Sequence, residues 1–337
     1  MKSAVFEKPG IIHLMDSPEP ILEAGWSLIA IGAVGICGTD LHMLHGDMGD
    51  KNGIRPGHEI SGVVERCSKG GEIREGDLVT IEPAHACGTC NYCIQGLPNH
   101  CKELAIFGVT RDGGLTELMA IPEKCLYSVS KSLPIEVVAL CEPLAVCLRV
   151  ARLTRIQKGD TVAILGGGSI GLISIIAAKH LGADEIHVIA KYQHQRELAL
   201  ELGAKRVYAN SDQALKEIGD RHIDISIETV GSRANTLDKA IYLTKPGGTI
   251  GVLGAFSDKV SISAFLLMVK ELRIVGSSCY GHEAPQADFS LASSILSFYK
   301  DSLLKLVTHC FSLDQVSEAF RAADDKSERS IKVQIKP

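Results

Sequence analysis

The chain has 337 residues, of which 45% are hydrophobic and 22% are charged, and its formal net charge is -5. This length exceeds what one ordinary core requires, so we expect two domains. The acidic balance argues against a nucleic-acid partner, and we expect no membrane span because no apolar run reaches the roughly 20 residues that cross a bilayer. The eleven cysteines are an odd number, and the first residues lack an apolar signal segment, so we expect a cytoplasmic protein with free or metal-bound thiols.

The first 150 residues predict β structure interrupted by loops. Short runs rich in β-branched residues, such as residues 61–64 and 78–81, are separated by glycine, proline and aspartate. Strands of this length with such punctuation indicate antiparallel pairing. Two groups of potential metal ligands occur within this β-rich region or directly after it.

The first group has the composition of an open metal site. It contains a thiol, a hydroxyl, two imidazoles and two carboxylates, which are Cys37, Thr39, His42, His58, Glu59 and Glu142. Taken alone, each is more often a buried thiol, a loop histidine or a surface charge. Their combination favours a zinc ion with mixed sulfur, nitrogen and oxygen ligands.

The second group is a closed set of four thiols within fifteen residues, Cys87, Cys90, Cys93 and Cys101. Four protein ligands are typical of structural zinc. An iron–sulfur cluster is the alternative, but seven residues instead of three precede the fourth cysteine, and Lys102 instead of proline follows it. We therefore expect a structural zinc ion that holds a loop with little core of its own.

The pattern changes near residue 155. Residues 161–165 form a continuous apolar run, as is typical of a strand buried on both faces. A helix over residues 172–181 and a strand over residues 186–189 follow, and further strands are predicted at 223–227, 249–253 and 272–275. Strands that alternate with helices predict a parallel sheet. After about residue 285 we expect a helix over 315–323 and a last strand over 331–335.

A glycine-rich motif lies between the first strand and helix of this second region. Residues 166–171 satisfy G-x-G-x-x-G, whose turn lets a pyrophosphate approach the free N–H groups of a helix N-terminus. The predicted cofactor contacts are Gly166, Gly168, Ser169, Ile170 and Gly171. A plain strand–turn–helix is the alternative, and it is the less frequent one in this context.

Lys191 stands twenty residues after Gly171, where an NAD site places a carboxylate on the ribose hydroxyls. A lysine reverses the charge at this position, and Arg196 and His194 are close by in the sequence. This favours the 2′-phosphate of NADP over NAD. An ordinary solvated lysine is the alternative.

In this order, the motifs resemble those of the zinc-dependent medium-chain dehydrogenase/reductase superfamily, nearest the sorbitol, threonine and other polyol dehydrogenases. The resemblance rests on residues 35–42, 57–59, 112–114, 141–145, 166–171 and the four cysteines. It implies an α/β fold with a GroES-like β-rich catalytic domain over 1–150, completed by a return over 285–337. A Rossmann domain, with a doubly wound parallel sheet, would bind the dinucleotide over 151–284, and the active site would lie in the cleft between them.

The resemblance also implies a role for each candidate residue. Cys37 and His58 would bind the catalytic zinc ion, and Glu59 would bind it or exchange with water. Glu142 falls where the third ligand varies between branches, although Cys141 is adjacent. Thr39 would hydrogen-bond the substrate alcohol and His42 would relay its proton. Asp40 would orient His58 by accepting its second N–H.

We therefore expect a zinc-dependent, NAD(P)-linked dehydrogenase that interconverts a secondary alcohol and its ketone. The substrate would be a polyol, amino alcohol or similar small molecule, and the protein would be a homodimer or homotetramer with two zinc ions per chain. One alternative is a reductase of the same fold that acts on carbon–carbon double bonds without a catalytic metal. Another is a non-catalytic structural or regulatory relative. The intact ligand set argues against both.

Overall fold

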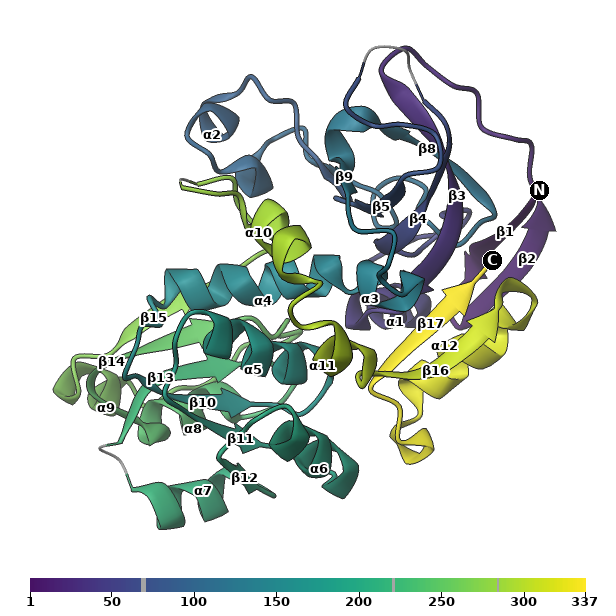
Figure 1. Ribbon diagram of the computed structural model, residues 1–337. Coiled ribbons are helices and arrows are strands. Elements are labelled where there is room, and N and C mark those ends of the chain that lie inside the picture. Colours follow the sequence, from purple (N-terminus) through teal and green to yellow (C-terminus); the bar gives the residue numbers. More distant parts are fainter. Residues whose placement is uncertain (68–70, 220–221, 284) are drawn as a thin grey trace. The chain divides into compact units, whose positions relative to one another are not determined.

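The computed structural model describes residues 1–67, 71–219, 222–283 and 285–337 (Figure 1). The chain forms two compact units, one made of Met1–Glu142 with Gly281–Pro337 and the other of Pro143–Tyr280. Among the helices in these described ranges, none has the length and hydropathy that crossing a bilayer requires.

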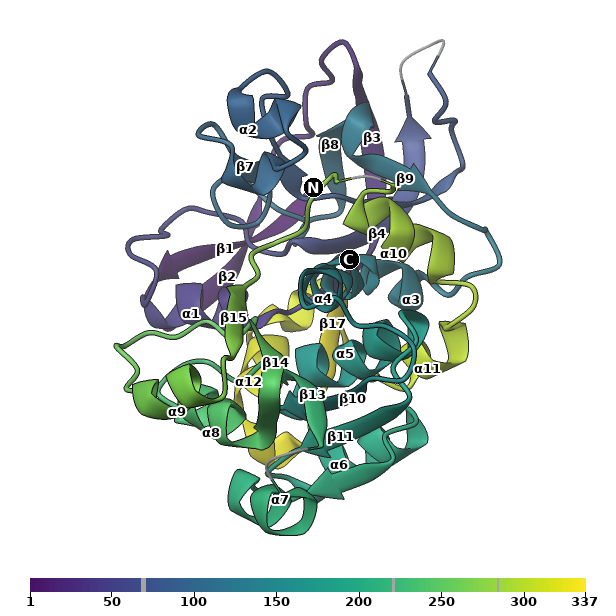
Figure 2. The same cartoon turned by 90° about the vertical axis from the view of Figure 1, so that its left-hand side faces the viewer.

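The first unit is built on a seven-stranded sheet in the order β16-β17-β3-β4-β5-β9, with β8 also paired to β3 (Figures 1 and 2). In chain order these strands are β3 (Trp26–Gly35), β4 (Glu59–Arg66), β5 (Leu78–Ile81), β8 (Leu118–Pro122), β9 (Leu126–Ser128), β16 (Val307–Ser312) and β17 (Lys332–Lys336). The C-terminal strand β17 pairs antiparallel with β3, which pairs with β4. Strand β3 therefore lies between two segments that are distant in the sequence.

Smaller elements complete this unit. A separate two-stranded sheet joins β1 (Lys2–Lys8) to β2 (Ile11–Asp16), and another joins β6 (Ala84–His85) to β7 (Ala105–Ile106). The helices are α1 (Gly38–His45), α2 (Asn91–Ile94), α3 (Ile135–Ala139), α10 (Asp288–Ile295), α11 (Lys300–Leu304) and α12 (Val316–Asp324). The core packs side chains of the sheet, such as Ile29, Ile60 and Ile335, against Phe320 of α12. By contrast, α2 has no buried residue, so its segment has little core.

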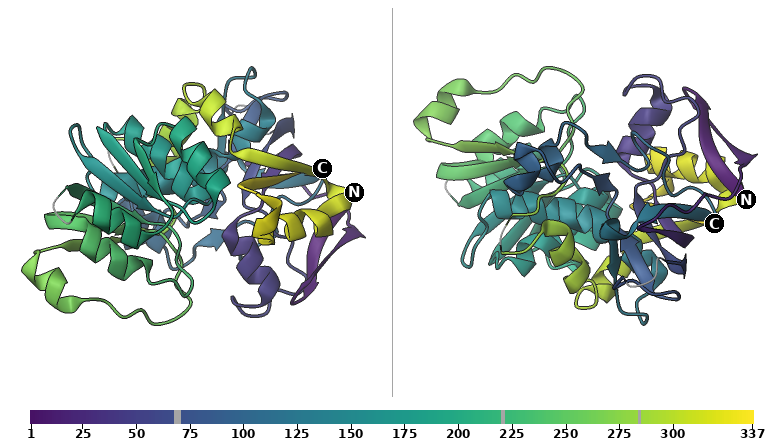
Figure 3. Two further views of the ribbon diagram at one scale, coloured as in Figure 1. Left: turned by 90° about the horizontal axis from the view of Figure 1, so that it is seen from below. Right: turned by 90° about the horizontal axis from the view of Figure 1, so that it is seen from above.

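The second unit contains a six-stranded, entirely parallel sheet in the order β12-β11-β10-β13-β14-β15. Its strands are β10 (Thr161–Leu165), β11 (Glu185–Ile189), β12 (Arg206–Tyr208), β13 (Ile223–Glu228), β14 (Thr244–Val252) and β15 (Arg273–Gly276). Its helices are α4 (Cys141–Leu153, within this unit from Pro143), α5 (Ser169–His180), α6 (Gln193–Glu201), α7 (Ser211–Ile218), α8 (Thr236–Leu243) and α9 (Ala264–Val269). The helices lie on both faces of the sheet (Figure 3), so the predicted doubly wound parallel sheet is confirmed.

Strand β11 begins one residue earlier than the sequence pattern predicts, at Glu185, and two further elements begin several residues earlier. Helix α5 starts at Ser169, directly after the glycine motif, and not at the apolar residue Leu172. Strand β14 starts at Thr244 because an irregularity in its pairing with β13 extends the strand beyond the apolar run. In both cases backbone geometry, and not hydrophobic periodicity, determines where the element starts.

Candidate active site and metal centres

The structure brings Cys37, His58 and Glu59 together in the first unit. One ligand atom from each residue lies within 4.8 Å of the others, and His58 and Glu59 are buried. Cys37 is the residue that precedes α1, whereas Glu59 is the first residue of β4. One sulfur, one nitrogen and one oxygen donor in this arrangement suit zinc.

Asp40 lies beside His58 but does not accept the hydrogen bond that the sequence predicts. Its Oδ1 is 3.6 Å from His58 Nδ1, which has no hydrogen-bond partner. The carboxylate of Asp40 accepts the N–H groups of Cys37 (2.8 Å) and Gly57 (3.2 Å). Burial lowers the pKa of His58, but Asp40 and then Cys37 outweigh this and leave the pKa well above its usual value. Because a metal ion binds the neutral imidazole, its binding would compete with protonation of His58.

Lys332 is a member of this site that sequence reasoning missed. Its Nζ lies 2.6 Å and 2.7 Å from the two carboxylate oxygens of Glu59, and the two side chains are 1% and 0% exposed. Burial lowers the pKa of Lys332, but Glu59 and Cys37 reverse the shift and raise it. A buried cation therefore holds the carboxylate of Glu59.

Gly35 provides the space for this carboxylate. Gly35 faces Glu59 in the pairing of β3 with β4. A Cβ atom at Gly35 would lie 2.0 Å from Glu59 Oε2, which is far inside van der Waals contact. The glycine is therefore required by the position of the Glu59 side chain and not by backbone conformation.

Glu142 and Cys141 are adjacent in the sequence but have different surroundings. The Cys141 thiol donates to the carbonyl oxygen of Phe289 at 4.0 Å, and burial raises its pKa. The pKa of Glu142 is raised to about 7, first by burial, with His58 lowering it and Glu59 raising it. These interactions place Glu142 near the ligand group, although it is not among the three residues within 4.8 Å.

Thr39 and His42 lie on α1, close to Cys37 in sequence. Thr39 Oγ1 is 3.8 Å from Cys37 Sγ, so the hydroxyl lies beside the thiol. His42 Nδ1 is 2.9 Å from Asp47 Oδ2, and both of these side chains are partly exposed. The helix thus carries one hydroxyl at the ligand group and two partly exposed imidazoles, those of His42 and His45.

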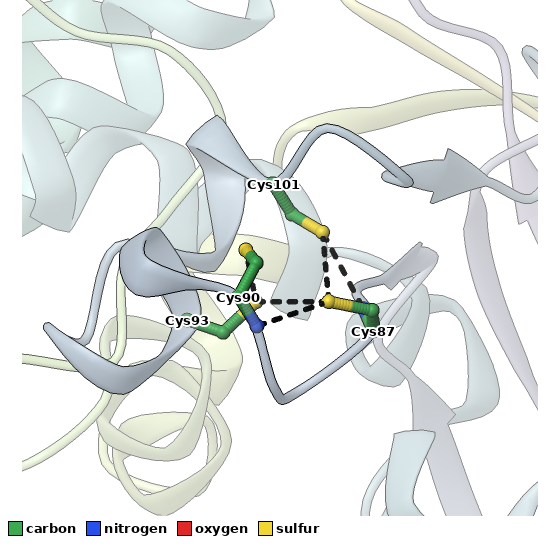
Figure 4. A group of neighbouring side chains, drawn as sticks. All are labelled: Cys87, Cys90, Cys93 and Cys101. Atoms are coloured by element: carbon green, nitrogen blue, oxygen red, sulfur yellow. Dashed lines mark hydrogen bonds between the residues drawn. The ribbon is translucent and has the colours of Figure 1, made fainter.

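The four cysteines form a second compact group, shown in Figure 4. The sulfur–sulfur distances are 3.9 Å for Cys87–Cys93, 3.5 Å for Cys90–Cys93 and 3.5 Å for Cys87–Cys101. Four sulfurs at 2.3 Å from a zinc ion would be about 3.8 Å apart in a tetrahedron. All four thiols are free of disulfide bonds, so their geometry fits a closed tetrathiolate site.

Backbone N–H groups prepare this group for thiolate chemistry. The N–H of Cys90 points at Cys87 Sγ, and the N–H of Cys87 points at Cys101 Sγ, both at 3.4 Å. Hydrogen bonds from the Thr89 and Cys90 backbone lower the pKa of Cys87 to about 6. Because the thiolate is the form that binds metal, this environment favours Cys87 as a ligand, whereas burial and then Cys90 raise the pKa of Cys93 to about 12.

The glycine motif of the second unit has the geometry of a dinucleotide site. Gly166 has a φ of +125°, and a Cβ atom at Gly171 would lie 2.0 Å from the Gly166 carbonyl oxygen. A Cβ atom at Gly168 would meet nothing within 4 Å, so the backbone is open to a ligand there. Ser169 and Ile170 follow in the first turn of α5, where N–H groups are free for phosphate.

Lys191 and Arg196 lie just beyond β11. Arg196 Nη1 donates to the carbonyl oxygens of Ala190 and Lys191, both at 2.8 Å. The Lys191 ammonium is 5.5 Å from the ring centroid of Tyr192. Two cations therefore stand at the carboxyl end of this strand, where Ala190 offers no carboxylate.

Comparison with known proteins agrees with both units. Residues 23–131 match the family described as "Alcohol dehydrogenase GroES-like domain", and residues 169–295 match the family described as "Zinc-binding dehydrogenase". The sorbitol dehydrogenase of Bacillus subtilis is 31% identical over 349 residues, which cover 100% of this chain and 97% of that protein. The resemblance and the fold class predicted from the sequence are confirmed.

Two solved structures of similar proteins contain dinucleotides. A zinc-binding dehydrogenase of Sinorhizobium meliloti 1021, bound to NADP, is 30% identical with a TM-score of 0.90 and 100% and 99% coverage of the two chains. An alcohol dehydrogenase of Escherichia coli CFT073, complexed with NADH, is 27% identical with the same TM-score and coverage. The chain therefore belongs to the zinc-binding alcohol dehydrogenase family of the medium-chain dehydrogenase/reductase superfamily, an oxidoreductase family that acts on alcohols and polyols.

Proposed function

We propose that this protein interconverts a secondary alcohol of the polyol class and its ketone, using a catalytic zinc ion and NADP or NAD. The observation that carries the proposal is the Cys37, His58 and Glu59 group with the Thr39 hydroxyl beside it. The similarity to a sorbitol dehydrogenase over the whole chain supports the substrate class.

The residues of the first unit divide the chemistry between them. Zinc, when bound, supplies a Lewis acid that lowers the pKa of an alcohol or polarises a carbonyl. Cys37 and His58 would hold it, with Glu59 or Glu142 completing the set. Thr39 would hydrogen-bond the reacting hydroxyl and pass its proton outward. His42, which reaches solvent beside Asp47, would release that proton.

The second unit would bind the dinucleotide through its glycine motif. The N–H groups of Ser169 and Ile170 would bind the pyrophosphate at the N-terminus of α5, where Gly168 leaves the approach open. Lys191 and Arg196 would bind the 2′-phosphate, because two cations and no carboxylate follow β11. This charge pattern is the reason to prefer NADP.

The cofactor preference is tested by reversing one charge. We expect Lys191→Asp to weaken NADPH binding by about tenfold or more, because an attractive contact worth about 1 kcal/mol becomes repulsive, and to leave NADH binding unchanged or tighter. Fluorescence titration with both cofactors measures this, and Lys179→Asp, on the far end of α5, is a control of equal charge change. Equal effects of Lys191→Asp on the two cofactors would exclude contact with the 2′-phosphate.

The function itself is tested by hydride transfer. Zinc-loaded protein should oxidise some members of a panel of polyols and secondary alcohols, and should reduce the matching ketones, with a change in nicotinamide absorbance. The Cys37→Ala variant should lose at least about 100-fold in kcat/KM, since Lewis-acid stabilisation supplies several kcal/mol. Activity on carbon–carbon double bonds that survives Cys37→Ala would favour the metal-independent reductase instead.

We also propose that two chains associate through the edge of the parallel sheet. Strand β15 ends the strand order and is mostly exposed, so its backbone groups are available for pairing. Helix α9 nearby in the sequence exposes Phe265 (71%), Met268 (64%) and Val269 (55%). An open strand with exposed apolar side chains supports the homodimer or homotetramer predicted above. We also propose a cytoplasmic location, because an odd number of cysteines suits thiols and metal ligands in a reducing compartment.

A further inference from the structure

The chain re-enters the first unit at Gly281, and three contacts hold it there. The N–H of Gly281 donates to Asp288 Oδ2 at 2.8 Å. The N–H of His282 donates to the carbonyl oxygen of Gly96 at 3.0 Å. The His282 ring places Nε2 2.9 Å from Glu82 Oε1. These partners come from three separate segments of the first unit, none of them used by the proposed chemistry.

Glu82 is the buried centre of this arrangement. Its side chain is 5% exposed, while that of His282 is 41% exposed. The second carboxylate oxygen of Glu82 accepts a hydrogen bond from Tyr127 Oη at 2.9 Å. Burial and the charge of Glu82 together raise the pKa of Tyr127, and they raise that of Cys125 to about 12. A buried carboxylate requires a cation or several donors, and His282, when protonated, supplies a positive charge beside Glu82.

Gly96 connects the same contact to the four-cysteine site. It lies between Cys93 and Cys101, in the cysteine lobe, which we define as residues 87–101. Gly96 has a φ of +78°, and a Cβ atom there would lie 3.2 Å from the His282 carbonyl oxygen. The lobe has few buried apolar side chains. Its attachment therefore depends on metal and on backbone contacts such as this one.

We propose that His282, Glu82 and Gly96 form a proton-dependent clasp that fastens the cysteine lobe, and thereby its zinc ion, to the returning chain at residues 281–283. Protonated His282 pairs with Glu82, and this fixes the His282 N–H on Gly96. When His282 is neutral, the attraction between opposite charges is lost, the hydrogen bond to Glu82 weakens and the lobe is held less firmly. The clasp links zinc retention in the lobe to pH, a property separate from hydride transfer.

The sign of the pH dependence follows from the groups around His282. The hydrogen bond to Glu82 raises its pKa most, burial opposes this, and the charges of Glu82 and Asp288 raise it further. Tyr127, Cys125 and Cys141 also lie around Glu82 and stay neutral because their pKa values are raised, and Lys124 acts on the same cluster through Cys125. Stabilisation by a group with a raised pKa is complete below its unfolded value, near 6.5, and disappears as pH rises through the folded value.

Zinc release from the lobe tests the clasp. The full chain with Cys37→Ala should bind zinc only at the four cysteines, and release to a chelator is timed at pH 6 and pH 9. Adding His282→Gln should speed release about fivefold at pH 6, because a partly exposed charged hydrogen bond is lost, and should change it little at pH 9. His309→Gln, a histidine bonded to the Thr308 hydroxyl, should have no effect at either pH. An equal acceleration at both pH values, or none at either, overturns the proposal.

The unsubstituted chain offers the same test without risk of misfolding. Hydrogen exchange of the His282 amide, corrected for its intrinsic rate, reports directly on its bond to Gly96. We expect its protection to fall about fivefold between pH 6 and pH 9, while that of Val162, in the centre of the second unit's sheet, stays constant. Constant protection of His282 over this range contradicts a proton-dependent clasp.

Discussion

Cys93→Ser should lower the free energy of unfolding of the first unit by more than about 4 kcal/mol, the range that accompanies loss of a structural metal. The lobe around Cys93 has little hydrophobic surface to bury, since no residue of α2 is buried. A serine hydroxyl at this position is a poor zinc ligand beside three thiolates. Chemical denaturation of zinc-loaded protein gives the free energy of unfolding, and the zinc content is measured on the same sample.

An exposed thiol provides the matched control for this substitution. Cys310 is exposed on β16, and no other cysteine lies near it in the sequence at the spacing of metal ligands. Cys310→Ser should change stability by no more than about 0.5 kcal/mol, as surface substitutions usually do. If the two serine variants were equally stable and Cys93→Ser kept its full zinc content, the four cysteines would not form a structural site.

Lys332→Met should destabilise the metal-free protein by about 3–5 kcal/mol, because it leaves the carboxylate of Glu59 buried without its cation. Both side chains of the pair are at most 1% exposed, so water cannot replace the lysine. Zinc would offer Glu59 a second cation, so the loss should be smaller in zinc-loaded protein. Denaturation of chelator-treated and zinc-loaded samples measures the difference.

Lys336, on the same strand, supplies the control for a lysine-to-methionine change. It pairs with Glu136, but its side chain is 41% exposed. Lys336→Met should therefore cost no more than about 1 kcal/mol. Combining Lys332→Met with Glu59→Gln should recover part of the stability, since no uncompensated charge remains. The interpretation of Lys332 is wrong if Lys332→Met and Lys336→Met lower the free energy of unfolding of the metal-free protein by the same amount.

Features that depend on residues close together in the sequence could be predicted from the sequence. The cysteine group lies within fifteen residues, and strands β5 and β10 have the predicted bounds. Likewise, the glycine motif opens α5 as expected. In each case the residues that determine the structure are neighbours along the chain, so composition and hydrophobic periodicity are enough to predict it.

Contacts between distant segments could not be predicted. Lys332 and Glu59 are 273 residues apart, and His282 and Glu82 are 200 residues apart. Only the pairing of β17 with β3 and the path of the returning chain bring these partners together. Nor does the sequence distinguish Cys141 from Glu142 as a ligand. Neighbouring residues of a helix point in different directions, and only the structure shows that Glu142 interacts electrostatically with His58.

Zinc content of the purified full-length chain is the most direct measurement of the central claim, that one chain carries a catalytic and a structural zinc ion. We expect two zinc ions per chain, one in Cys37→Ala and one in Cys93→Ser, with hydride transfer lost at least in Cys37→Ala. A single zinc ion that survives Cys37→Ala and disappears in Cys93→Ser would contradict the account. It would leave the fold without a catalytic metal and point to a reductase of carbon–carbon double bonds.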